Sequence, residues 1–469
     1  MSTLKVEEGE VLLKHTQSLC PVCKKLKPAM VIEQPTKAGK KQVVMRRLCP
    51  CHGLFEFIIA SDSRFYWLAQ GNVAADCGCG PGCCSAGSGG KAGTLGLNAT
   101  DVSRVGIIEK LSTCLALIEI VDGCDLPCDT CFADAPLVHA GGDPKAHSFD
   151  EIVARVQGVI ARKGKIEVLQ FSGGEPTMHP EFFRLIEWVR QNPNIDYLLI
   201  NTNGKRIAQD ADFAARLVEM YKRFDNIQLY LQFDGPQLQG QYAIRGFDIR
   251  ALREQAILRC AESGLPITLA MVVSPETLPF VWNTVEYGLT HEHVRGVSFQ
   301  PKFLSGRTPE KYIPQELPNP ITVADVILGL NDQSQGKVAL DDFTPLPCGD
   351  PNCAAIGWRF RLKGRNFSPS EIGIDLVALQ KSLPDRINYR IEDLQRCGCE
   401  NTPLGDLMKE LEVKESNAFR LTIKPFMDYR TWDIHRIDRC CTHVIRPDGK
   451  LDSFCRYYGP KPDESCCKD

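Results

Sequence analysis

Residues 114–131 read CLALIEIVDGCDLPCDTC and join an apolar run to three closely spaced cysteines. The run 114–121 has the length and the branched apolar content of a buried β-strand. Cys124, Cys128 and Cys131 follow it with the spacing C-x3-C-x2-C, in the loop that leaves the carboxyl end of that strand. In parallel α/β folds, ligand sites lie at this edge of the sheet. The stretch therefore predicts a metal-binding loop carried by a strand.

The same strand opens a series of alternating β and α segments. The further strand-like runs lie at 167–172, 196–202, 226–234, 266–274 and 294–301. Helical segments separate these runs, with apolar residues at i, i+3, i+4 and i+7. Six βα units in series predict a parallel sheet with helices outside it, either a doubly wound sheet or a partial barrel. Of the two, we expect an α/β chain in which residues 112–305 form a partial (βα)6 barrel of the TIM type.

Composition and charge limit the class of protein. Of the 469 residues, 43% are hydrophobic, and the net charge is −3. This balance argues against a grip on nucleic acid that rests on bulk electrostatics. The chain has no run of eighteen apolar residues, and it begins with the charged segment MSTLKVEEGE. We therefore expect a cytoplasmic protein with no integral membrane segment and no nucleic-acid partner.

The 22 cysteines are the strongest signal in the composition. Eleven disulfides are implausible in a reducing compartment, so we expect most of the 22 thiols to be metal ligands, redox groups or buried apolar side chains. Cys114 and Cys260 stand alone in apolar segments, where packing in the core is the expected role. The other cysteines cluster at short spacings, as metal sites require.

The number of cysteines in the triad Cys124, Cys128 and Cys131 is informative. A [4Fe–4S] cluster normally takes four cysteines, so three ligands leave one iron open for a substrate or cofactor. A zinc knuckle, or a cluster with a distant fourth cysteine, is the alternative interpretation of this spacing. The triad alone leaves these possibilities open.

A second motif, GGEP at 173–176, follows the second predicted strand. Two glycines let the backbone approach a ligand closely, and the carboxylate of Glu175 can accept hydrogen bonds from an ammonium group. Alone, this motif is a weak turn signal. One βα unit after the triad, it places backbone amides and an anion next to the open iron.

These motifs together resemble the radical S-adenosylmethionine (SAM) superfamily. The resemblance implies that Cys124, Cys128 and Cys131 hold a [4Fe–4S] cluster whose open iron chelates SAM. Electron transfer, from a donor such as flavodoxin or ferredoxin, then cleaves the sulfonium, usually to a 5′-deoxyadenosyl radical that abstracts hydrogen from the substrate. The cofactor supplies this chemistry, while the protein orients it and excludes water.

The resemblance also implies roles for residues that follow the predicted strands. The segment that matches the methionine-binding part of the family is Gly173, Gly174 and Glu175. The side chains expected to contact the ribose or the substrate are Asn201, Asn203 and Asp234. Turn chemistry is the alternative role of these last three, because Asn-Gly and Asp-Gly are strong turn dipeptides.

Two features depart from the family pattern. Many relatives carry an aromatic residue just before the third cysteine, where this chain has Thr130, and Phe132 is expected to pack the adenine instead. The terminal pair Cys466 and Cys467 is unfamiliar. Because vicinal thiols bind soft thiophiles, transfer of a SAM-derived aminocarboxypropyl or alkyl group to trivalent arsenic is an alternative function. Ligation of auxiliary clusters, or a redox-active dithiol, is the plainer role of these cysteines.

Two cysteine knuckles flank a basic, β-like stretch near the N-terminus. Members of the family subgroup described below carry a small rubredoxin-like metal site there, which implies such a domain for residues 1–70. Cys20, Cys23, Cys49 and Cys51 are its candidate ligands, in a tetrahedral site for mononuclear iron or zinc. Cys51 and His52 compete for the fourth position, or that ligand comes from Cys77 or Cys79. A structural site is the default role, and an electron conduit is the alternative.

The remaining cysteines extend into two further regions. Residues 71–111 are a glycine- and cysteine-rich connecting segment, and 306–469 are expected to form a cysteine-rich C-terminal cap. Knuckles in these regions are suited to one or two auxiliary [4Fe–4S] clusters. The candidate ligands are Cys77, Cys79, Cys83, Cys348, Cys353, Cys440, Cys441 and Cys455. Spacing alone does not assign them to particular clusters.

The N-terminal knuckles, the core and the segment RCCTHVIRPDGKLDSFC at 439–455 resemble one subgroup of the superfamily. That subgroup contains tetraether lipid synthase and a dihydropterin-precursor methyltransferase. It implies an enzyme that forms carbon–carbon bonds, or transfers methyl or alkyl groups, on a small-molecule or lipid substrate. A non-catalytic multi-cluster electron carrier and a zinc-stabilised binding scaffold are the alternatives from other classes.

Overall fold

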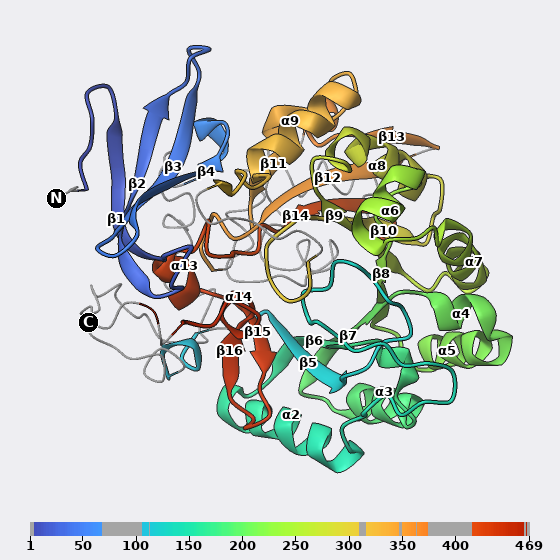
Figure 1. Ribbon diagram of the computed structural model, residues 1–469. Coiled ribbons are helices and arrows are strands. Elements are labelled where there is room, and N and C mark those ends of the chain that lie inside the picture. The colour runs from blue at the N-terminus through green and yellow to red at the C-terminus, as the bar shows by residue number, and fades with distance from the viewer. Residues whose placement is uncertain are drawn as a thin grey trace, which may run out of the picture.

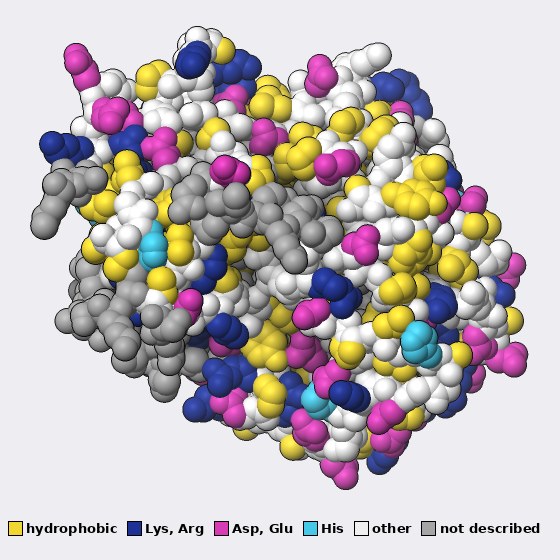
Figure 2. All heavy atoms as spheres, in the orientation of Figure 1, with side chains coloured by type: hydrophobic (Ala, Val, Ile, Leu, Met, Phe, Trp, Pro, Cys, Tyr) yellow, Lys and Arg dark blue, Asp and Glu magenta, His cyan; other side chains and the backbone are white. Residues whose placement is uncertain are grey.

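The computed structural model describes residues 4–67, 106–111, 113–308, 316–346, 349–362, 364–373, 415–463 and 466. Figure 1 shows a small sheet near the N-terminus beside a larger body in which helices surround a central sheet. On the face drawn in Figure 2, acidic and basic side chains are mixed among the residues that are coloured. No helix within the described ranges is long and apolar enough to span a bilayer.

The N-terminal domain is a four-stranded antiparallel sheet in the order of the chain. Its strands are β1 (Val11–Leu19), β2 (Leu26–Pro35), β3 (Lys41–Cys49) and β4 (Gly53–Ala60). Val31, Val43 and Met45 form a small buried core. The two turns β1–β2 and β3–β4 carry the cysteine knuckles, so that pairing of the strands brings the knuckles to one end of the sheet.

The core of the larger body is a run of parallel strands that pair in sequence order. These are β5 (Leu115–Val121), β6 (Ile166–Gly173), β7 (Ile195–Thr202), β8 (Ile227–Gln232), β9 (Ile267–Val273) and β10 (Val294–Pro301). Each ladder is parallel, and helices lie between successive strands. The expected α/β class and partial (βα)6 barrel are confirmed.

The outer layer consists of amphipathic helices that bury their apolar side on the sheet. They are α2 (Phe149–Lys163), α3 (Phe182–Gln191), α4 (Lys205–Gln209), α5 (Ala211–Phe224), α6 (Leu238–Arg245), α7 (Arg250–Ala261) and α8 (Val281–Leu289). The Ser148 hydroxyl caps the start of α2 by accepting from the Glu151 N–H. Gly164 ends α2 and Gly264 follows α7, both with positive φ, as is typical of glycines that end helices.

The C-terminal region adds strands to both edges of the barrel sheet. Its elements are α9 (Val323–Gln333), β11 (Phe343–Pro345), β12 (Ala355–Leu362), β13 (Arg365–Phe367), β14 (Ala418–Ile423), α13 (Ile434–Asp438), β15 (Thr442–Ile445), β16 (Leu451–Ser453) and α14 (Phe454–Tyr457). β14 pairs in parallel with β10, and β15 pairs in parallel with β5. This region therefore completes the sheet, a role that the sequence did not suggest for it.

Buried polar contacts join the N-terminal sheet to the C-terminal region. Asp433, the N-cap of α13, accepts a hydrogen bond from Thr16 Oγ1 at 2.6 Å and pairs with Lys14 Nζ at 2.6 Å. Burial alone would raise the pKa of Asp433, but Lys14 and Thr16 hold it below its usual value. Arg47, fully buried on β3, donates to the Leu19, Tyr429 and Arg430 carbonyl oxygens. The two regions thus share charged contacts that water does not reach.

Replacing Asp433 by alanine is expected to lower the free energy of unfolding by about 3 kcal/mol, because Lys14 and Thr16 lose their buried partner. The pKa of Asp433 is lowered in the folded state, so its contribution is present above the unfolded pKa. This contribution is lost as the pH falls through the folded value. Denaturant unfolding of the full chain at several pH values should show the two proteins converging in acid.

The matched control is Lys41→Ala, which breaks the exposed pair of Lys41 with Glu33. Exposed pairs contribute about 1 kcal/mol or less. An equal loss in the two variants would contradict the structural role of Asp433.

Candidate functional site

A cavity of about 270 Å³ opens inside the barrel, between the triad loop and the inner face of the strands. Alternate residues of each strand line it, as expected for a closed pleated wall. All three triad cysteines line it, together with Gly173 and Gly174. The structure thus brings the two sequence motifs to the mouth of one cavity, at the carboxyl ends of β5 and β6.

The triad loop is held in place by contacts on both sides. Cys131 and Arg307 exchange two backbone hydrogen bonds of 2.9 Å each. The Arg307 side chain donates to the Cys128 carbonyl oxygen at 3.0 Å. On the other side, the Cys124 N–H donates to the Pro136 carbonyl oxygen at 2.9 Å. These contacts fix the path of the loop, so that the three thiols can face one ligand.

The chemistry of the triad fits a metal cluster. Burial, together with the nearby Glu175 and Asp125 carboxyl groups, raises the pKa of the Cys124 thiol to about 12. A thiolate at this position therefore needs a positive charge, which the irons of a cluster supply when bound. The structure fits the expected ligand set of Cys124, Cys128 and Cys131.

The GGEP loop lies against the triad loop with no space for side chains. A Cβ atom built on Gly173 would lie 2.0 Å from the Val121 carbonyl oxygen. One built on Gly174 would lie 1.9 Å from the Gly123 carbonyl oxygen. Gly173 also has a φ of +117°, which other residues rarely adopt. Glycine is required at both positions because the two backbones touch.

Glu175 is fully buried behind these glycines and is not among the residues that line the cavity. Its carboxylate accepts from Thr177, from Thr202 Oγ1 at 2.6 Å and from the Asn203 N–H at 2.8 Å. Burial and the nearby Asp125 carboxylate raise the pKa of Glu175 to about 7, although these hydrogen bonds oppose that shift. The carboxylate therefore ties the GGEP loop to the end of β7, and the glycine backbone faces the cavity.

The other predicted cofactor contacts fall into two groups. Asn201, Asp234 and Phe132 are among the residues that line the cavity, but the Asp234 carboxylate is fully buried and is already bound by protein groups. Asn203 is buried and donates to Asp125 Oδ1 at 2.8 Å, and its Nδ2 lies 3.9 Å from Cys124 Sγ. Phe132 packs edge-on against Tyr458 and at a tilt against Phe454, so that its ring is fixed in the cavity wall.

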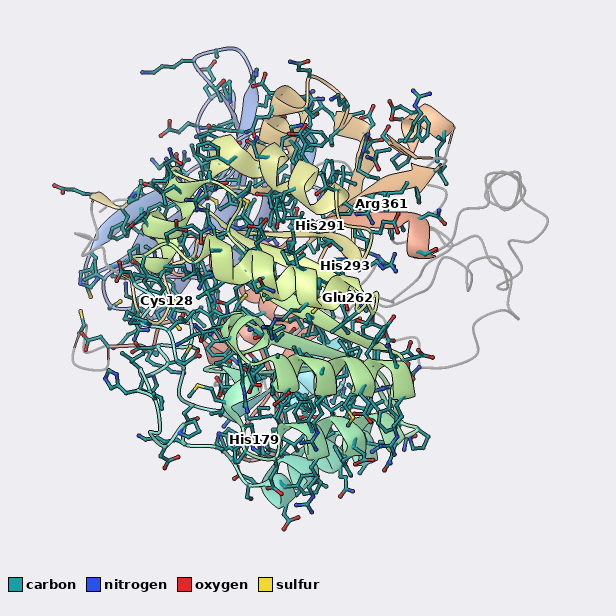
Figure 3. The ribbon with its side chains drawn as sticks, turned by 90° about the vertical axis from the view of Figure 1, so that its right-hand side faces the viewer. Cys128, His179, Glu262, His291, His293 and Arg361 are labelled. Atoms are coloured by element: carbon teal, nitrogen blue, oxygen red, sulfur yellow. The ribbon has the colours of Figure 1, made fainter. Side chains whose placement is uncertain are left out.

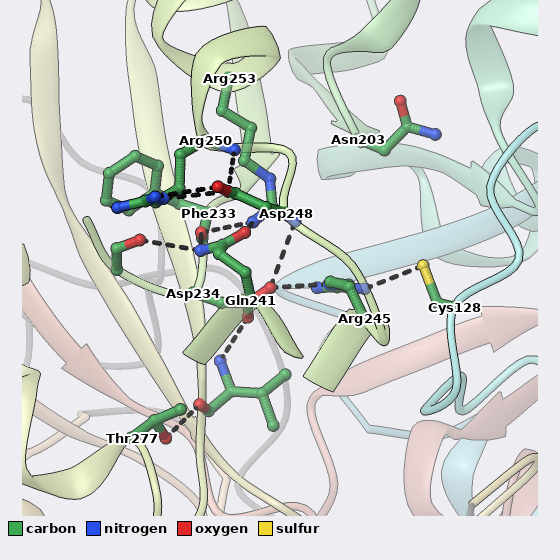
Figure 4. A network of polar contacts seen from close by, with 12 residues as sticks. Cys128, Asn203, Phe233, Asp234, Gln241, Arg245, Asp248, Arg250, Arg253 and Thr277 are labelled. Carbon is green, nitrogen blue, oxygen red and sulfur yellow. Dashed lines mark hydrogen bonds and ion pairs between the residues drawn. The ribbon is translucent and has the colours of Figure 1, made fainter. Parts of the chain in front are cut away.

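Asp234 belongs to a buried network that sequence reasoning did not predict (Figure 4). Its Oδ2 accepts from Arg245 Nε at 2.7 Å and pairs with Arg253 Nη2 at 3.3 Å. Its Oδ1 accepts from the Val272 N–H at 3.0 Å. Burial opposes ionisation, but the two arginines hold the pKa of Asp234 below its usual value. Arg245 also reaches Cys128, with Nη1 lying 3.8 Å from the sulfur.

Inside the barrel, amide and hydroxyl groups form hydrogen-bonded chains on the cavity wall. Tyr230 donates to Ser298 Oγ at 2.7 Å and accepts from Gln300 Nε2 at 2.7 Å. Burial raises the pKa of Tyr230 to about 12, so it stays a neutral phenol. Gln228 likewise accepts from Tyr197 at 2.8 Å and donates to Thr268 at 2.6 Å. Apolar side chains such as those of Leu117 and Leu199 also line the cavity, as do the charged side chains of Arg245, Lys302, Arg307, Arg420 and Lys424.

The polar lining of the cavity wall could have been predicted from the sequence of β8. Parallel strands that are covered on both faces are usually apolar throughout. In NIQLYLQFD, the polar or hydroxyl-bearing residues Gln228, Tyr230 and Gln232 alternate with apolar residues. That alternation indicates a barrel whose interior carries polar groups.

Two histidines with lowered pKa values, His291 and His293, lie away from this site. Figure 3 shows Cys128 at one end of the barrel, and His291, His293 and Arg361 at the other. Burial lowers the pKa of His293 to about 4, and its Nε2 lies 3.0 Å from the Ile257 carbonyl oxygen. These residues belong to the packing at the amino ends of the strands.

A second candidate metal centre lies at the end of the N-terminal sheet. Ligand atoms of Cys20, Cys23, Cys49 and His52 all lie within 4.8 Å of one another. His52 Nδ1 lies 3.3 Å from Cys49 Sγ. Three sulfurs and one imidazole nitrogen fit a tetrahedral zinc site. Cys51 is exposed and lies outside this group, so His52 takes the fourth position in the structure.

The C-terminal cysteines form a third group. Cys440 and Cys441 precede β15, which runs parallel to β5. They therefore lie at the amino ends of these strands, whereas the triad loop leaves the carboxyl end of β5. Burial raises the pKa of the Cys440 thiol, and the charges of Cys441, Cys455 and Cys353 raise it further. The four thiols are therefore close enough to interact electrostatically.

The remaining predicted cysteines lie at different places in the chain. Cys114 and Cys260 are buried in the core, as expected. Cys466 lies at the N-terminal metal centre, with its Sγ 3.5 Å from His52 Nε2. The remaining candidates Cys77, Cys79, Cys83, Cys348 and Cys467 lie outside the described residues.

Comparison with known proteins places both metal centres in known domains. Residues 118–287 match the Radical SAM superfamily, and residues 12–61 match the HMPTM N-terminal zinc ribbon domain. The chain is 24% identical to a 7,8-dihydro-6-hydroxymethylpterin dimethyltransferase of Methanocaldococcus jannaschii over 95% of this chain and 93% of that protein. It is 34% identical to a GTP 3′,8-cyclase of Pectobacterium atrosepticum over 20% of this chain and 28% of that protein.

Similar solved structures include Streptococcus suis SuiB bound to S-adenosylmethionine. The TM-score is 0.36 and the identity 15%, over 48% of this chain and 47% of that one. The matched superfamily region contains both the triad and the GGEP loop, and the zinc ribbon region contains the Cys20, Cys23, Cys49 and His52 group. Residues 118–287 of the chain are therefore a radical SAM domain, which follows an N-terminal zinc ribbon domain at residues 12–61.

Proposed function

We propose that this enzyme cleaves SAM at a [4Fe–4S] cluster on Cys124, Cys128 and Cys131, and transfers a carbon group to a pterin-like small molecule. A methyl group is the proposed cargo: it leaves the sulfonium of a second SAM molecule, which becomes S-adenosylhomocysteine, and a second electron from the donor completes the transfer. The observation that carries the proposal is the placement of the triad beside a cavity whose wall is partly polar. Similarity over 95% of the chain to a dihydropterin dimethyltransferase supports the same substrate class.

In this proposal the cluster, when bound, supplies the electron that cleaves SAM, and a flavodoxin or ferredoxin supplies that electron to the cluster. The chain's own residues hold SAM and the substrate and orient them. The Gly173 and Gly174 backbone offers polar groups to the methionine part of SAM. Phe132 offers an aromatic face for the adenine. The enclosing barrel keeps water away from the reacting atoms.

The cavity favours a small ring over a long lipid. Its volume of about 270 Å³ lies near the lower end of small-molecule sites. Hydroxyl and amide groups of Tyr230, Ser298 and Gln300 suit a flat heterocycle with hydrogen-bonding edges. Among the described residues, the thiols that line the cavity are those of the triad. The cavity wall thus adds no support to a metalloid substrate.

A second proposal concerns an auxiliary cluster. Cys353, Cys440, Cys441 and Cys455 are the candidate ligands among the described residues. Four cysteines at one site suit a [4Fe–4S] centre better than they suit a packed apolar core, and burial raises the pKa of the Cys353, Cys440 and Cys455 thiols. The N-terminal zinc ribbon is proposed to bind one zinc ion in a structural role.

Cys128→Ala is expected to abolish reductive SAM cleavage, because the cluster loses one of its three ligands. The measurement is 5′-deoxyadenosine release by anaerobically reconstituted protein with dithionite. Cys260→Ala, which removes a buried thiol far from any cysteine cluster, should leave the release unchanged. Full cleavage by the Cys128 variant would contradict the assignment of the triad, and absence of cleavage by the wild-type protein would return the chain to the class of electron carriers or scaffolds.

Tyr230→Phe is expected to lower kcat/KM for 7,8-dihydro-6-hydroxymethylpterin about 10-fold or more, because Ser298 and Gln300 lose a buried hydrogen-bonding partner. The assay follows gain of a methyl group by mass spectrometry, with SAM and reductant present. Tyr242→Phe, at an exposed tyrosine, is the matched control. Absence of any methylated pterin with the wild-type enzyme, despite active SAM cleavage, would rule out this substrate.

Cys455→Ser is expected to lower the iron content by about four atoms per chain, if the C-terminal cysteines hold a [4Fe–4S] cluster. The triad cluster should remain and is detected by its SAM-dependent EPR signal. The zinc should also remain and is measured by metal analysis. Unchanged iron in Cys455→Ser would exclude the auxiliary centre without touching the proposal for the triad.

A further inference from the structure

Arg245 is the last residue of α6, and its guanidinium connects the triad to the barrel interior (Figure 4). Nε donates to Asp234 Oδ2 at 2.7 Å, and Nη1 lies 3.8 Å from Cys128 Sγ, within the range of an N–H···S hydrogen bond. The Arg245 side chain is 8% exposed, and that of Asp234 is fully buried. A charged donor therefore faces the sulfur of Cys128 from inside the protein.

The position of Arg245 is fixed by its surroundings. Asp234 is held by Arg253 and by the Val272 N–H, so it cannot turn away from Arg245. Arg253 in turn donates to the Phe233 carbonyl oxygen at 2.6 Å. This buried network keeps the guanidinium at one place, with little freedom to leave the sulfur.

The end of α6 is also fastened directly to the triad loop. The Thr130 N–H donates to the Ile244 carbonyl oxygen at 3.2 Å. Gly246, which follows Arg245 with a φ of +82°, lies so close that an added Cβ would sit 2.5 Å from Asp129 Oδ2. The loop and the helix end therefore move as one unit, and Arg245 keeps its distance from Cys128.

The two neighbouring cysteines differ in their donors. Cys124 has the neutral amide of Asn203 at 3.9 Å, and its surroundings include the Glu175 and Asp125 carboxyl groups. Cys128 instead has the positively charged guanidinium of Arg245 as its donor. Reduction adds one negative charge to an iron–sulfur cluster, and hydrogen bonds and positive charge at its sulfur ligands stabilise that charge.

We propose that Arg245, oriented by Asp234, is a positioning residue that acts through the Cys128 sulfur to raise the reduction potential of the triad's cluster. The inference rests on the triad holding a [4Fe–4S] cluster, and it does not depend on which substrate receives the carbon group. Arg245 in this role makes the cluster easier to reduce by a cellular donor.

The test is a redox titration of the anaerobically reconstituted full chain, with the EPR signal of the reduced triad cluster as readout. In Arg245→Gln, the ratio of reduced to oxidised cluster at a fixed potential should fall about tenfold, which is about 59 mV for a one-electron couple. Arg245→Lys keeps the charge and should recover most of that ratio. Arg250→Gln is the matched control, because Arg250 pairs with Asp248 on the exposed side of the same segment.

An unchanged ratio in Arg245→Gln with a full complement of iron would overturn the proposal. If that variant fails to load a cluster, nitrogen couplings decide instead. Pulsed EPR of the reduced wild-type cluster, with ¹⁵N-labelled arginine, should show a ¹⁵N coupling that weakens in Arg245→Lys, where Arg307 on the triad loop is still labelled. A coupling of unchanged strength in that variant would overturn the proposal. If the enzyme does not methylate a pterin, the redox titration and the pulsed EPR measurement are unaffected. If the enzyme does not cleave SAM, the reduction potential of the wild-type cluster is still measurable, but no 5′-deoxyadenosine is released.

Discussion

The contact between two backbones at Gly174 and Gly123 is the constraint on which the site depends. The carboxyl ends of β5 and β6 meet so closely that no side chain fits between the loops that follow them. Parallel pairing of the two strands creates this approach, and glycine alone tolerates it. The triad and the GGEP backbone can face one cavity only because of that contact. Glu175 and the Asp234 network lie deeper in the site and hold these loops in place through buried polar contacts.

Much of this arrangement was predictable from the sequence. The alternation of strand-like and helical segments predicted the six parallel strands, and the spacing of Cys124, Cys128 and Cys131 predicted the loop that carries them. These features depend on local periodicity and on residues close in the chain, which a single sequence displays directly.

What the sequence did not reveal depends on contacts between distant residues. Arg245 reaches Cys128 only because a helix end packs on the triad loop, and nothing near Arg245 in the chain indicates a sulfur. The strands β14 and β15 are short, and their neighbours across the sheet come from far earlier in the chain. The choice of His52 over Cys51 at the N-terminal centre likewise follows from the turn after β3, because adjacent residues in a tight turn point in different directions.

The late arrival of β14 and β15 has a consequence for synthesis of the protein. β5, which carries the triad loop, pairs with β15 near the end of the chain, and the N-terminal sheet contacts Asp433 in the same late region. Contacts of such long sequence separation close last and slow folding. On the ribosome, the barrel therefore has open sheet edges and uncovered thiols until translation is almost complete. The protein surroundings of the triad loop are complete only after this last part of the chain has been made.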